Sequence, residues 1–260
     1  MNNVQPVAAC AVIPFYNHPH TIRALVRELR QLELPVIIVD DGSERSCAPV
    51  LAAVQAEEQD VSVVSLAHNR GKGAAVVAGA RAALQRGFTH MLQIDADGQH
   101  DTAAVAPALH IARKHPQAMV IGIPVFDDSI PRARFYGRWL THGLVWVQTW
   151  SLAIRDAMCG FRIYPLAPFV ALADRHRIAA RMGFDIDVAV RLVWDKVPVR
   201  HVAVNVRYPQ DGISHFDMWR DNLRISMLHM RLLAGMLLRT PILARQRLCS
   251  NRRHRGRAGG

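Results

Sequence analysis

The first half of the sequence alternates short apolar runs, rich in β-branched residues, with longer stretches of helical character. Continuous apolar strands that alternate with helices are typical of a mostly parallel sheet with helices on both faces. The alternation therefore predicts an α/β fold in which ligands bind beyond the carboxyl ends of the strands. The expected strands span residues 7–13, 36–39, 61–66, 91–94 and 119–123, and the expected helices span residues 20–32, 47–58, 73–86 and 102–115.

The length and composition suit one large domain, alone or with an appendage. The chain has 260 residues, of which 50% are hydrophobic, so it can bury a sizeable core. Its four cysteines show no Cys-x-x-Cys spacing, which indicates a reducing compartment rather than a disulfide framework. The N-terminal segment lacks the basic stretch of a signal peptide, and no uncharged apolar run reaches the ~18 residues of a spanning helix. We therefore expect a cytoplasmic protein.

The net charge of +11 is unevenly distributed. Seven of these charges are arginines after residue 238, where there is no acidic residue. We expect residues 239–260 to form a disordered basic tail, which either binds anionic lipid, at about 1 kcal/mol per charge near the surface, or only keeps the protein soluble. Nucleic acid is not an expected partner, because the tail has neither a recognition motif nor interleaved aromatic residues.

A long helix is expected over residues 133–154. Its side chains Phe135, Trp139, Trp146 and Trp150 fall within a narrow arc at helical spacing. Such a tryptophan stripe is more often part of a core than a membrane anchor. Three tryptophans within twelve residues nevertheless also fit a membrane interface.

A second helix, over residues 216–238, has arginines on one stripe at Arg220, Arg224 and Arg231 and is apolar over most of its remaining surface. This surface is too apolar for an exposed helix and too charged for a simple membrane span. We interpret it as an amphipathic, membrane-associating helix, with packing on the domain or oligomerisation as alternatives.

The strand expected over residues 91–94 ends in two carboxylates separated by one residue, Asp95 and Asp97. A strand that delivers Asp-x-Asp into a loop can hold a hard divalent cation, and Mg²⁺ is usually shared between carboxylates and substrate phosphates. Alone, the motif is equally compatible with a solvated turn, because Asp and Gly favour turns. The motifs around it decide between the two interpretations.

Polar motifs also follow the other expected strands. The first strand ends Ile13-Pro14-Phe15-Tyr16-Asn17, and the second ends Val39-Asp40-Asp41-Gly42-Ser43, where a carboxylate can accept hydrogen bonds from a ribose or a base. The third leads into His68-Asn69-Arg70-Gly71-Lys72-Gly73, whose glycines permit close backbone approach and whose lysine favours an anion. The spacing fits neither a P-loop nor a dinucleotide fingerprint.

This ordered set of motifs resembles glycosyltransferase family 2, whose members have the GT-A fold. The segment Asp95-Ala96-Asp97-Gly98-Gln99-His100 looks most like the dolichyl-phosphate mannose synthase branch, which glycosylates polyprenyl phosphates. Cys159-Gly160-Phe161-Arg162 and Asp211-Gly212-Ile213-Ser214-His215-Phe216 extend the resemblance to about residue 216. It implies a GT-A catalytic domain over residues 1–215. The sequence departs from the family pattern at His18, Cys159 and His215, where an acid, a serine and a lysine are common.

The resemblance implies a UDP- or GDP-hexose donor and a divalent metal, Mg²⁺ or Mn²⁺, that bridges its diphosphate. Asp40 and Asp41 would hold the base and ribose. Asp95, Asp97 and Gln99 would hold the metal, which stabilises the departing diphosphate as a Lewis acid; Asp97 is therefore also a candidate catalytic residue. The complete set of implied donor-binding residues is Pro14, Tyr16, Asn17, Asp40, Asp41, Asn69, Lys72 and Asp95.

The resemblance also implies an inverting transfer to a lipid-linked acceptor such as polyprenyl phosphate, by a protein peripheral on the inner face of the cell membrane. The membrane contacts would be the C-terminal helix and the basic tail. If the acceptor is instead a hydroxyl of a lipid or polyketide-like molecule, Asp185 is the candidate general base; otherwise it only begins a helix. The implied acceptor- or phosphate-binding residues are Arg132, Arg134, Arg138, Arg162, Ser214 and His215.

Two further functions stay open. A non-catalytic nucleotide-sugar-binding protein could keep the same fold, although the intact Asp95, Asp97 and Lys72 argue against it. A nucleotidyltransferase is disfavoured, because no glycine-rich loop with arginine and lysine follows the first strand.

Overall fold

The computed structural model describes residues 6–125, 132–206 and 218–257, without the side chains of residues 132–137, 218–219 and 241–257. In this part of the chain, seven strands form one sheet in the order β3-β2-β1-β4-β6-β5-β7. All of them run in the same direction except β6, which is antiparallel to both of its neighbours. The strands are β1 Ala9–Phe15, β2 Val36–Asp40, β3 Val61–Ser65, β4 His90–Gln93, β5 Met119–Val125, β6 Arg162–Pro165 and β7 Val199–Asn205.

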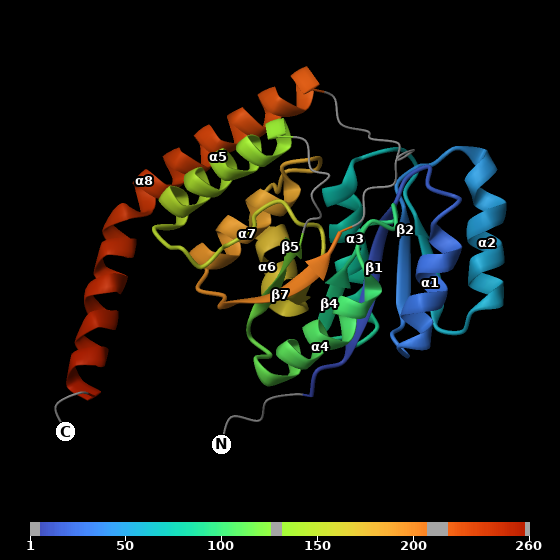
Figure 1. Cartoon of the computed structure of the whole chain (residues 1–260), viewed down its shortest axis with the longest axis horizontal. Helices are drawn as coiled ribbons and strands as arrows, with labels where there is room; N and C mark the ends of the chain where they lie inside the picture. The colour runs from blue at the N-terminus through green and yellow to red at the C-terminus, as the bar shows by residue number, and fades with distance from the viewer. Residues whose placement is uncertain (1–5, 126–131, 207–217, 258–260) are drawn as a thin grey trace.

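Helices cover both faces of this sheet (Figure 1). Side chains of β1 show why, because Cys10 and Val12 join the apolar cluster on one face, whereas Ala11 and Phe15 join the cluster on the other. The predicted α/β architecture with a mostly parallel sheet is therefore confirmed. The helices are α1 Ile22–Gln31, α2 Ala48–Glu57, α3 Lys72–Gln85, α4 Val105–Lys114, α5 Arg132–Thr149, α6 Leu166–Arg175, α7 Phe184–Trp194 and α8 Met218–Arg257, with 3-10 turns η1 Arg45–Cys47 and η2 Thr102–Ala104.

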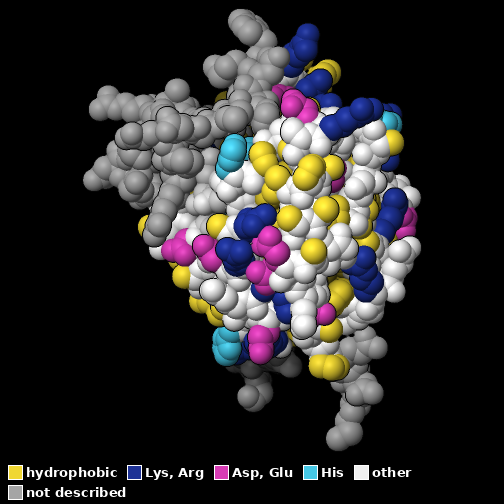
Figure 2. Space-filling view, turned by 90° about the vertical axis from the view of Figure 1, so that its right-hand side faces the viewer, with side chains coloured by type: hydrophobic (Ala, Val, Ile, Leu, Met, Phe, Trp, Pro, Cys, Tyr) yellow, Lys and Arg dark blue, Asp and Glu magenta, His cyan; other side chains and the backbone are white. Residues whose placement is uncertain are grey.

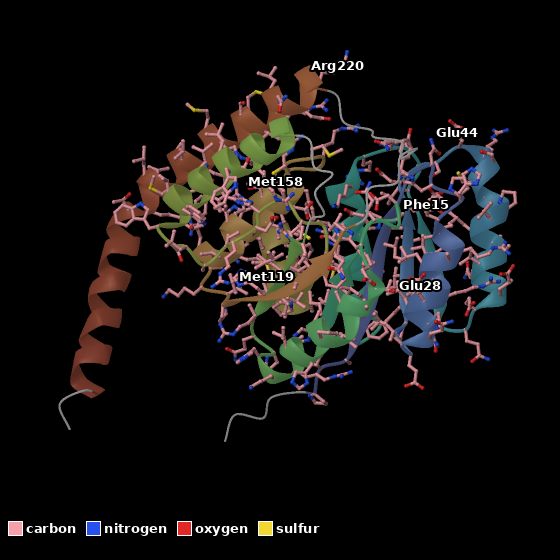
Figure 3. All side chains as sticks on the ribbon, in the orientation of Figure 1. Phe15, Glu28, Glu44, Met119, Met158 and Arg220 are labelled. Carbon is pink, nitrogen blue, oxygen red and sulfur yellow. The ribbon has the colours of Figure 1, made fainter. Side chains whose placement is uncertain are left out.

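The first face is covered by α3, α6 and α7, and the second by α1, α2 and α4. Figure 3 shows Phe15 at the end of β1 and Glu28 on α1. Helices α5 and α8 lie side by side against α7, at the end of the molecule away from α1 and α2 (Figure 1).

The tryptophan stripe of α5 does not form a continuous core contact. Trp139 is 52% exposed, whereas Trp150 packs against the core at the other end of the helix. The buried side of α5 instead includes the polar residues Thr141, His142 and Gln148. Gln148 is buried because its side chain and carbonyl bind groups on α7 and α8.

Helix α8 continues to Arg257, into the segment from residue 239 for which we expect a disordered tail. The first half of the helix is already nucleated by packing on the domain, and the Leu, Ala, Arg and Gln residues that follow have high helix propensity. Figure 1 shows that the helix bends and its end runs away from the sheet. Pro241, which has no N–H to donate, lies within it, and proline is a usual cause of a bend.

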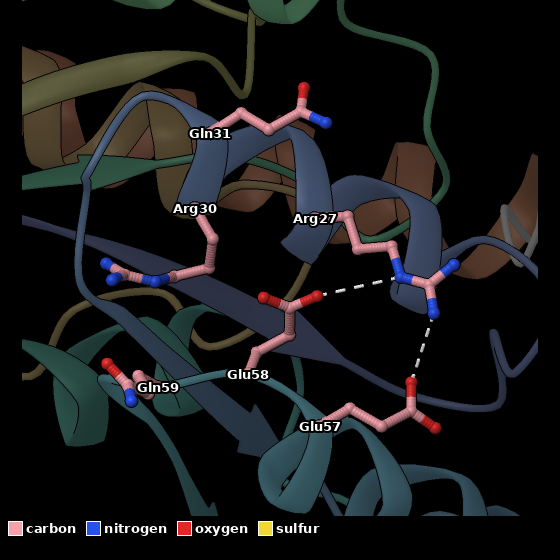
Figure 4. Close-up of a pocket in the computed structure, with 6 residues that line it drawn as sticks. All are labelled: Arg27, Arg30, Gln31, Glu57, Glu58 and Gln59. Atoms are coloured by element: carbon pink, nitrogen blue, oxygen red, sulfur yellow. Dashed lines mark hydrogen bonds and ion pairs between the residues drawn. The ribbon is translucent and has the colours of Figure 1, made fainter.

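A hollow of about 560 Å³ lies between the ends of α1 and α2 (Figure 4). Both helices end just before a strand begins, so the hollow lies at the amino ends of the strands, opposite the predicted site. Its charges are paired with each other, since Arg27 lies 3.2 Å from Glu57 and 3.6 Å from Glu58. Figure 2 shows the same pattern on this face of the molecule, where basic side chains lie next to acidic ones. The hollow is lined by Arg27, Arg30, Gln31, Glu57, Glu58 and Gln59.

Candidate active site

A cluster of three charged side chains lies at the carboxyl end of β4. Asp95 follows β4, Lys72 begins α3 and Asp185 lies in the first turn of α7. The Lys72 Nζ lies 2.7 Å from Asp95 Oδ1 and 3.0 Å from Asp185 Oδ2, so one ammonium bridges two carboxylates. Burial alone would lower the pKa of Lys72, but the charges of Asp185 and Asp95 raise it above its ordinary value. Burial also opposes ionisation of Asp95, yet Lys72 holds the pKa of that carboxyl below its ordinary value.

The second carboxylate of the motif, Asp97, has a different environment. Its Oδ1 accepts a hydrogen bond from the main-chain N–H of Gln99 at 3.0 Å. Burial, followed by the charge of Asp95, raises the pKa of Asp97 above its ordinary value. A carboxylate whose ionisation is disfavoured by burial and by a neighbouring carboxylate fits a divalent cation, whose charge would favour its ionised form.

In the described residues no group of three or more His, Cys, Asp or Glu side chains has the arrangement of a complete metal cage. A cation on Asp95 and Asp97 would therefore take its other ligands elsewhere, and substrate phosphate and water oxygens are the usual source for Mg²⁺. Gln99, the third predicted ligand, is half-buried beside Asp97.

Asp185 is held on every side by polar contacts within the chain. Its Oδ2 accepts from Lys72, and its Oδ1 accepts from Gln93 Nε2 at 2.8 Å. Its main-chain carbonyl accepts from Arg162 Nη1 at 2.6 Å. Gln93 was not predicted, although a polar residue inside a buried strand is a recognisable signal, since such a group needs a buried partner.

Arg162 does not have the environment of a phosphate ligand. It is fully buried, and it donates from Nε to Cys159 O and from Nη2 to Ala157 O, each at 2.8 Å. With Asp185 O and the Tyr164 hydroxyl as further acceptors, its guanidinium is occupied by β6 and the surrounding main chain. In this structure Arg162 positions the start of α7, and its acceptor-phosphate role stays a prediction.

The loop before β6 passes directly against the charged cluster. A Cβ on Gly160 would clash with the Asp95 carboxylate and lie 2.8 Å from Lys72 Nζ, so a larger residue there would displace the charged cluster. Cys159, the departure from the family pattern, is buried with its Sγ 3.8 Å from His100 Nε2, and burial raises its pKa to about 12. The thiol is therefore protonated near neutral pH and acts as a small, weakly polar group.

Asp41 joins two of the predicted donor loops. Its two carboxylate oxygens accept from the N–H groups of Arg70 and Gly71 at 2.8 Å and 2.7 Å, and it is only 2% exposed. Its predicted contact with the base or ribose stays a prediction. Gly42 permits the close approach, because its φ is +69° and a Cβ there would lie 2.5 Å from the His68 carbonyl carbon.

The remaining donor residues lie at the ends of the first three strands. Asp40 Oδ1 accepts from Ser43 N at 3.0 Å and the side chain is half-buried. Asn17, at a φ of +55°, accepts from Glu44 N through Oδ1 at 2.9 Å and so ties the end of β1 to the loop after β2. Pro14, Tyr16 and Asn69 are half-buried in the same region, and their contacts with a donor stay predictions.

Of the predicted acceptor arginines, Arg138 binds Asp156 Oδ2 through Nε at 2.7 Å. Asp156 is buried and also accepts from Cys159 N at 2.7 Å, so this pair connects α5 with the loop at the charged cluster. Arg132 and Arg134 begin α5, but their side chains lie outside the described residues, as do Ser214 and His215 entirely.

The sequence matches the family model described as glycosyl transferase family 2 over residues 10–170. It is 30% identical over 217 residues to a dolichyl-phosphate beta-glucosyltransferase from Mus musculus, a match that covers 75% of the chain and 65% of that relative. It is 31% identical over 193 residues to an undecaprenyl-phosphate mannosyltransferase from Micrococcus luteus, covering 69% and 75%. The chain thus spans slightly less than two thirds of the length of the glucosyltransferase.

Solved structures share the fold. Glucosyl-3-phosphoglycerate synthase from Mycobacterium tuberculosis, in complex with Mn²⁺, uridine-diphosphate-glucose and phosphoglyceric acid, has a TM-score of 0.63 at 17% identity, over 90% of this chain and 79% of that one. A mannosyltransferase from Pyrobaculum calidifontis, in complex with GDP-Man and Mn²⁺, has a TM-score of 0.53 at 15% identity, over 81% and 61%. These likenesses confirm the GT-A fold. Since the family model matches more than half of the sequence, the chain belongs to glycosyl transferase family 2.

Proposed function

We propose that this protein transfers a hexose from a UDP- or GDP-sugar to a polyprenyl phosphate, with inversion, and that Asp95 and Asp97 hold a divalent cation. Family membership supports the reaction class, and the named relatives act on dolichyl and undecaprenyl phosphates. Two fold neighbours contain Mn²⁺ with a nucleotide sugar. The observation that carries the proposal is the cluster of Lys72, Asp95 and Asp185 next to Asp97 at a strand end.

The donor side of the reaction follows from the charges at this strand end. A bound cation supplies Lewis-acid stabilisation to the nucleoside diphosphate as it departs. Lys72 lies beside Asp95 and is also paired with Asp185. Its ammonium would supply a positive charge to a phosphate oxygen of the donor. Asp40, half-buried at the end of β2, is the more accessible of the two predicted carboxylates for the base or ribose.

The surroundings of Asp185 favour a phosphate acceptor over a hydroxyl. Both of its carboxylate oxygens already accept hydrogen bonds, from Lys72 and from Gln93. A hydroxyl acceptor would need one of these oxygens to take its proton, at the expense of a largely buried contact. An ionised phosphate needs no base, and Asp185 then holds Lys72 in place.

The acceptor lipid also requires access to a membrane, for which α5 and α8 provide an apolar surface. Opposite its buried side, α8 exposes Leu223, Met227, Met230 and Leu237 at helical spacing. The exposed side of α5 adds Trp139, Leu140 and Val147. Within the described residues, no helix combines the length and hydropathy needed to cross a bilayer. We therefore include in the proposal that this exposed surface of α5 and α8, which we call the α5–α8 surface, lies in the lipid interface.

The test is transfer of labelled hexose to a short polyprenyl phosphate from UDP-glucose, GDP-mannose and related donors, with Mn²⁺ present. We expect Asp97→Ala to abolish transfer and the donor-dependent rise in melting temperature that Mn²⁺ allows. If Asp97→Ala transferred sugar and gained stability from donor as the wild type does, the assignment of Asp97 as a metal ligand would be wrong. A wild-type protein that binds a donor but transfers no sugar to any acceptor would instead support a non-catalytic nucleotide-sugar-binding protein.

Asp185→Asn separates the two acceptor classes. Loss of a general base lowers the rate about 10²- to 10⁴-fold. Loss of a charge that only holds Lys72 should cost less than about tenfold, because Asn keeps an oxygen that can accept from Lys72. We expect the smaller effect. Asp174→Asn is the control, since Asp174 on α6 forms an exposed ion pair with Arg81 on α3.

A further inference from the structure

Asp187 is a buried charge that the proposed reaction does not use. It lies two residues after Asp185 in the first turn of α7 and is fully buried. Its Oδ1 lies 2.5 Å from Arg191 Nε, one turn further along the same helix. Its Oδ2 lies 2.7 Å from Arg231 Nη2, which comes from α8. A buried carboxylate needs such partners, and one of them is supplied by the helix that forms the α5–α8 surface.

The packing around this ion pair is close. Leu228 on α8 is buried against Gly183, the residue before α7, where a Cβ would lie 2.7 Å from Leu228 Cδ2. Further along the two helices, Gly235 fits against the ring of Trp194. Helix α8 therefore rests directly on α7, and Arg231 fixes its position at the turn where α7 begins.

Two chains of contact connect Asp187 with the donor site. The first is the helical turn itself, because Asp185 in the same turn binds Lys72 on its other side. The second passes through the main chain. Ala179 N donates to Asp187 Oδ2 at 2.8 Å, and the carbonyl of the following residue, Ala180, accepts from Gly73 N at 2.8 Å. Gly73 directly follows Lys72. The first route therefore ends at Lys72, which bridges Asp95 and Asp185, and the second ends at the residue that follows Lys72.

We propose that Asp187 and Arg231 are a positioning pair that couples the seating of α8 to the geometry of Lys72, Asp95 and Asp185. The pair acts through Asp185 and through the Ala179–Ala180 main chain, without touching substrate. The expected effect of this pair on turnover rests on the proposed glycosyl transfer. The expected effect on the local structure around Lys72 does not depend on that activity, so the two effects can be tested separately.

The experiment compares Arg231→Met with Arg224→Met. The two arginines lie on the same helix with side chains 48% and 49% exposed. Arg224, however, pairs with Asp221 within α8 and, among the described residues, has no ion pair to α7. The first measurement is hydrogen exchange of peptides covering residues 71–75 and 178–187, in the absence of donor and lipid. We expect faster exchange in both peptides for Arg231→Met and wild-type exchange for Arg224→Met. Equal exchange in the two variants overturns the coupling, whether or not the protein transfers sugar.

The second measurement is turnover with polyprenyl phosphate in vesicles. We expect Arg231→Met to lower kcat about 2- to 30-fold, the range of effects for mutations along a coupling network, with vesicle binding equal to that of Arg224→Met. Arg231→Lys, which keeps the charge, should recover most of the loss. A loss that falls on vesicle binding alone would assign Arg231 to the membrane surface and contradict the positioning role. Absence of transfer in the wild type would count against the proposed function only.

Discussion

At the scale of single residues, the ammonium of Lys72 and a divalent cation would compete for the carboxylate of Asp95. Its Nζ lies within 3 Å of both oxygens of Asp95, one of the two proposed metal ligands. Replacing Lys72 by Met removes a positive charge from a site that already holds three carboxylates. We therefore expect Mn²⁺ to bind the donor-free variant roughly tenfold or more tightly, because the attraction between close charges is several kcal/mol at a protein surface. Titration calorimetry, or the electron paramagnetic resonance signal of free Mn²⁺, measures this.

The same variant should lose stability without metal. Asp185 is almost buried, and removing the partner of a largely buried charge costs about 3 kcal/mol. Lys114→Met on α4, which is exposed, is the control for a lost lysine. Unchanged Mn²⁺ affinity in Lys72→Met would mean that the lysine and the cation do not compete.

Much of the candidate site could be predicted from the sequence, because strand ends of a parallel sheet meet at one edge. Asp95 and Lys72 were expected on this basis, and they lie in contact. The sequence does not predict which atoms are already occupied within the chain. Arg162 and Asp41 occur in the expected motifs, and both bind main-chain groups in this structure. A motif predicts which residues lie near a site, whereas the hydrogen bonds that occupy each atom depend on the whole fold.

At the scale of helices and strands, the predictions were good where periodicity was strong. Strands β6 and β7 were missed, because β6 has only four residues and β7, at the edge of the sheet, includes Arg200 and His201 within its apolar pattern. The two sides of α5 were also misjudged, since tryptophan spacing predicts a stripe but not which stripe faces the core. Gln148 faces the inside of the protein, because its side chain binds His229 and its carbonyl accepts from Trp194.

The α5–α8 surface makes a testable prediction at this scale. Burying an exposed Leu or Met side chain contributes about 1.5–3 kcal/mol at most, so the double variant Met230→Ser/Leu237→Ser should release the protein from vesicles. Both side chains are more than 60% exposed, so the fold should be little affected. Flotation with vesicles that contain anionic lipid measures the binding. Leu84→Ser on α3, also exposed, should bind as the wild type does, and equal flotation of the double variant would place the membrane contact elsewhere.

At the scale of the whole molecule, buried histidines make stability depend on pH. Burial lowers the pKa of His90, His142 and His229 below the ordinary value of 6.5. The unfolded chain therefore binds more protons than the folded one just below pH 6.5, so this contribution to stability is complete above that pH and is lost as the pH falls. Each histidine contributes a slope of up to about 1.4 kcal/mol per pH unit, and urea midpoints between pH 8 and about pH 5 measure the sum.

His90→Gln should flatten this dependence of stability on pH, because His90 Nε2 lies 2.8 Å from Pro116 O inside the fold and Gln is neutral at every pH. His110→Gln, on the exposed side of α4, should leave it unchanged, and a slope equal in both variants would show that His90 does not contribute.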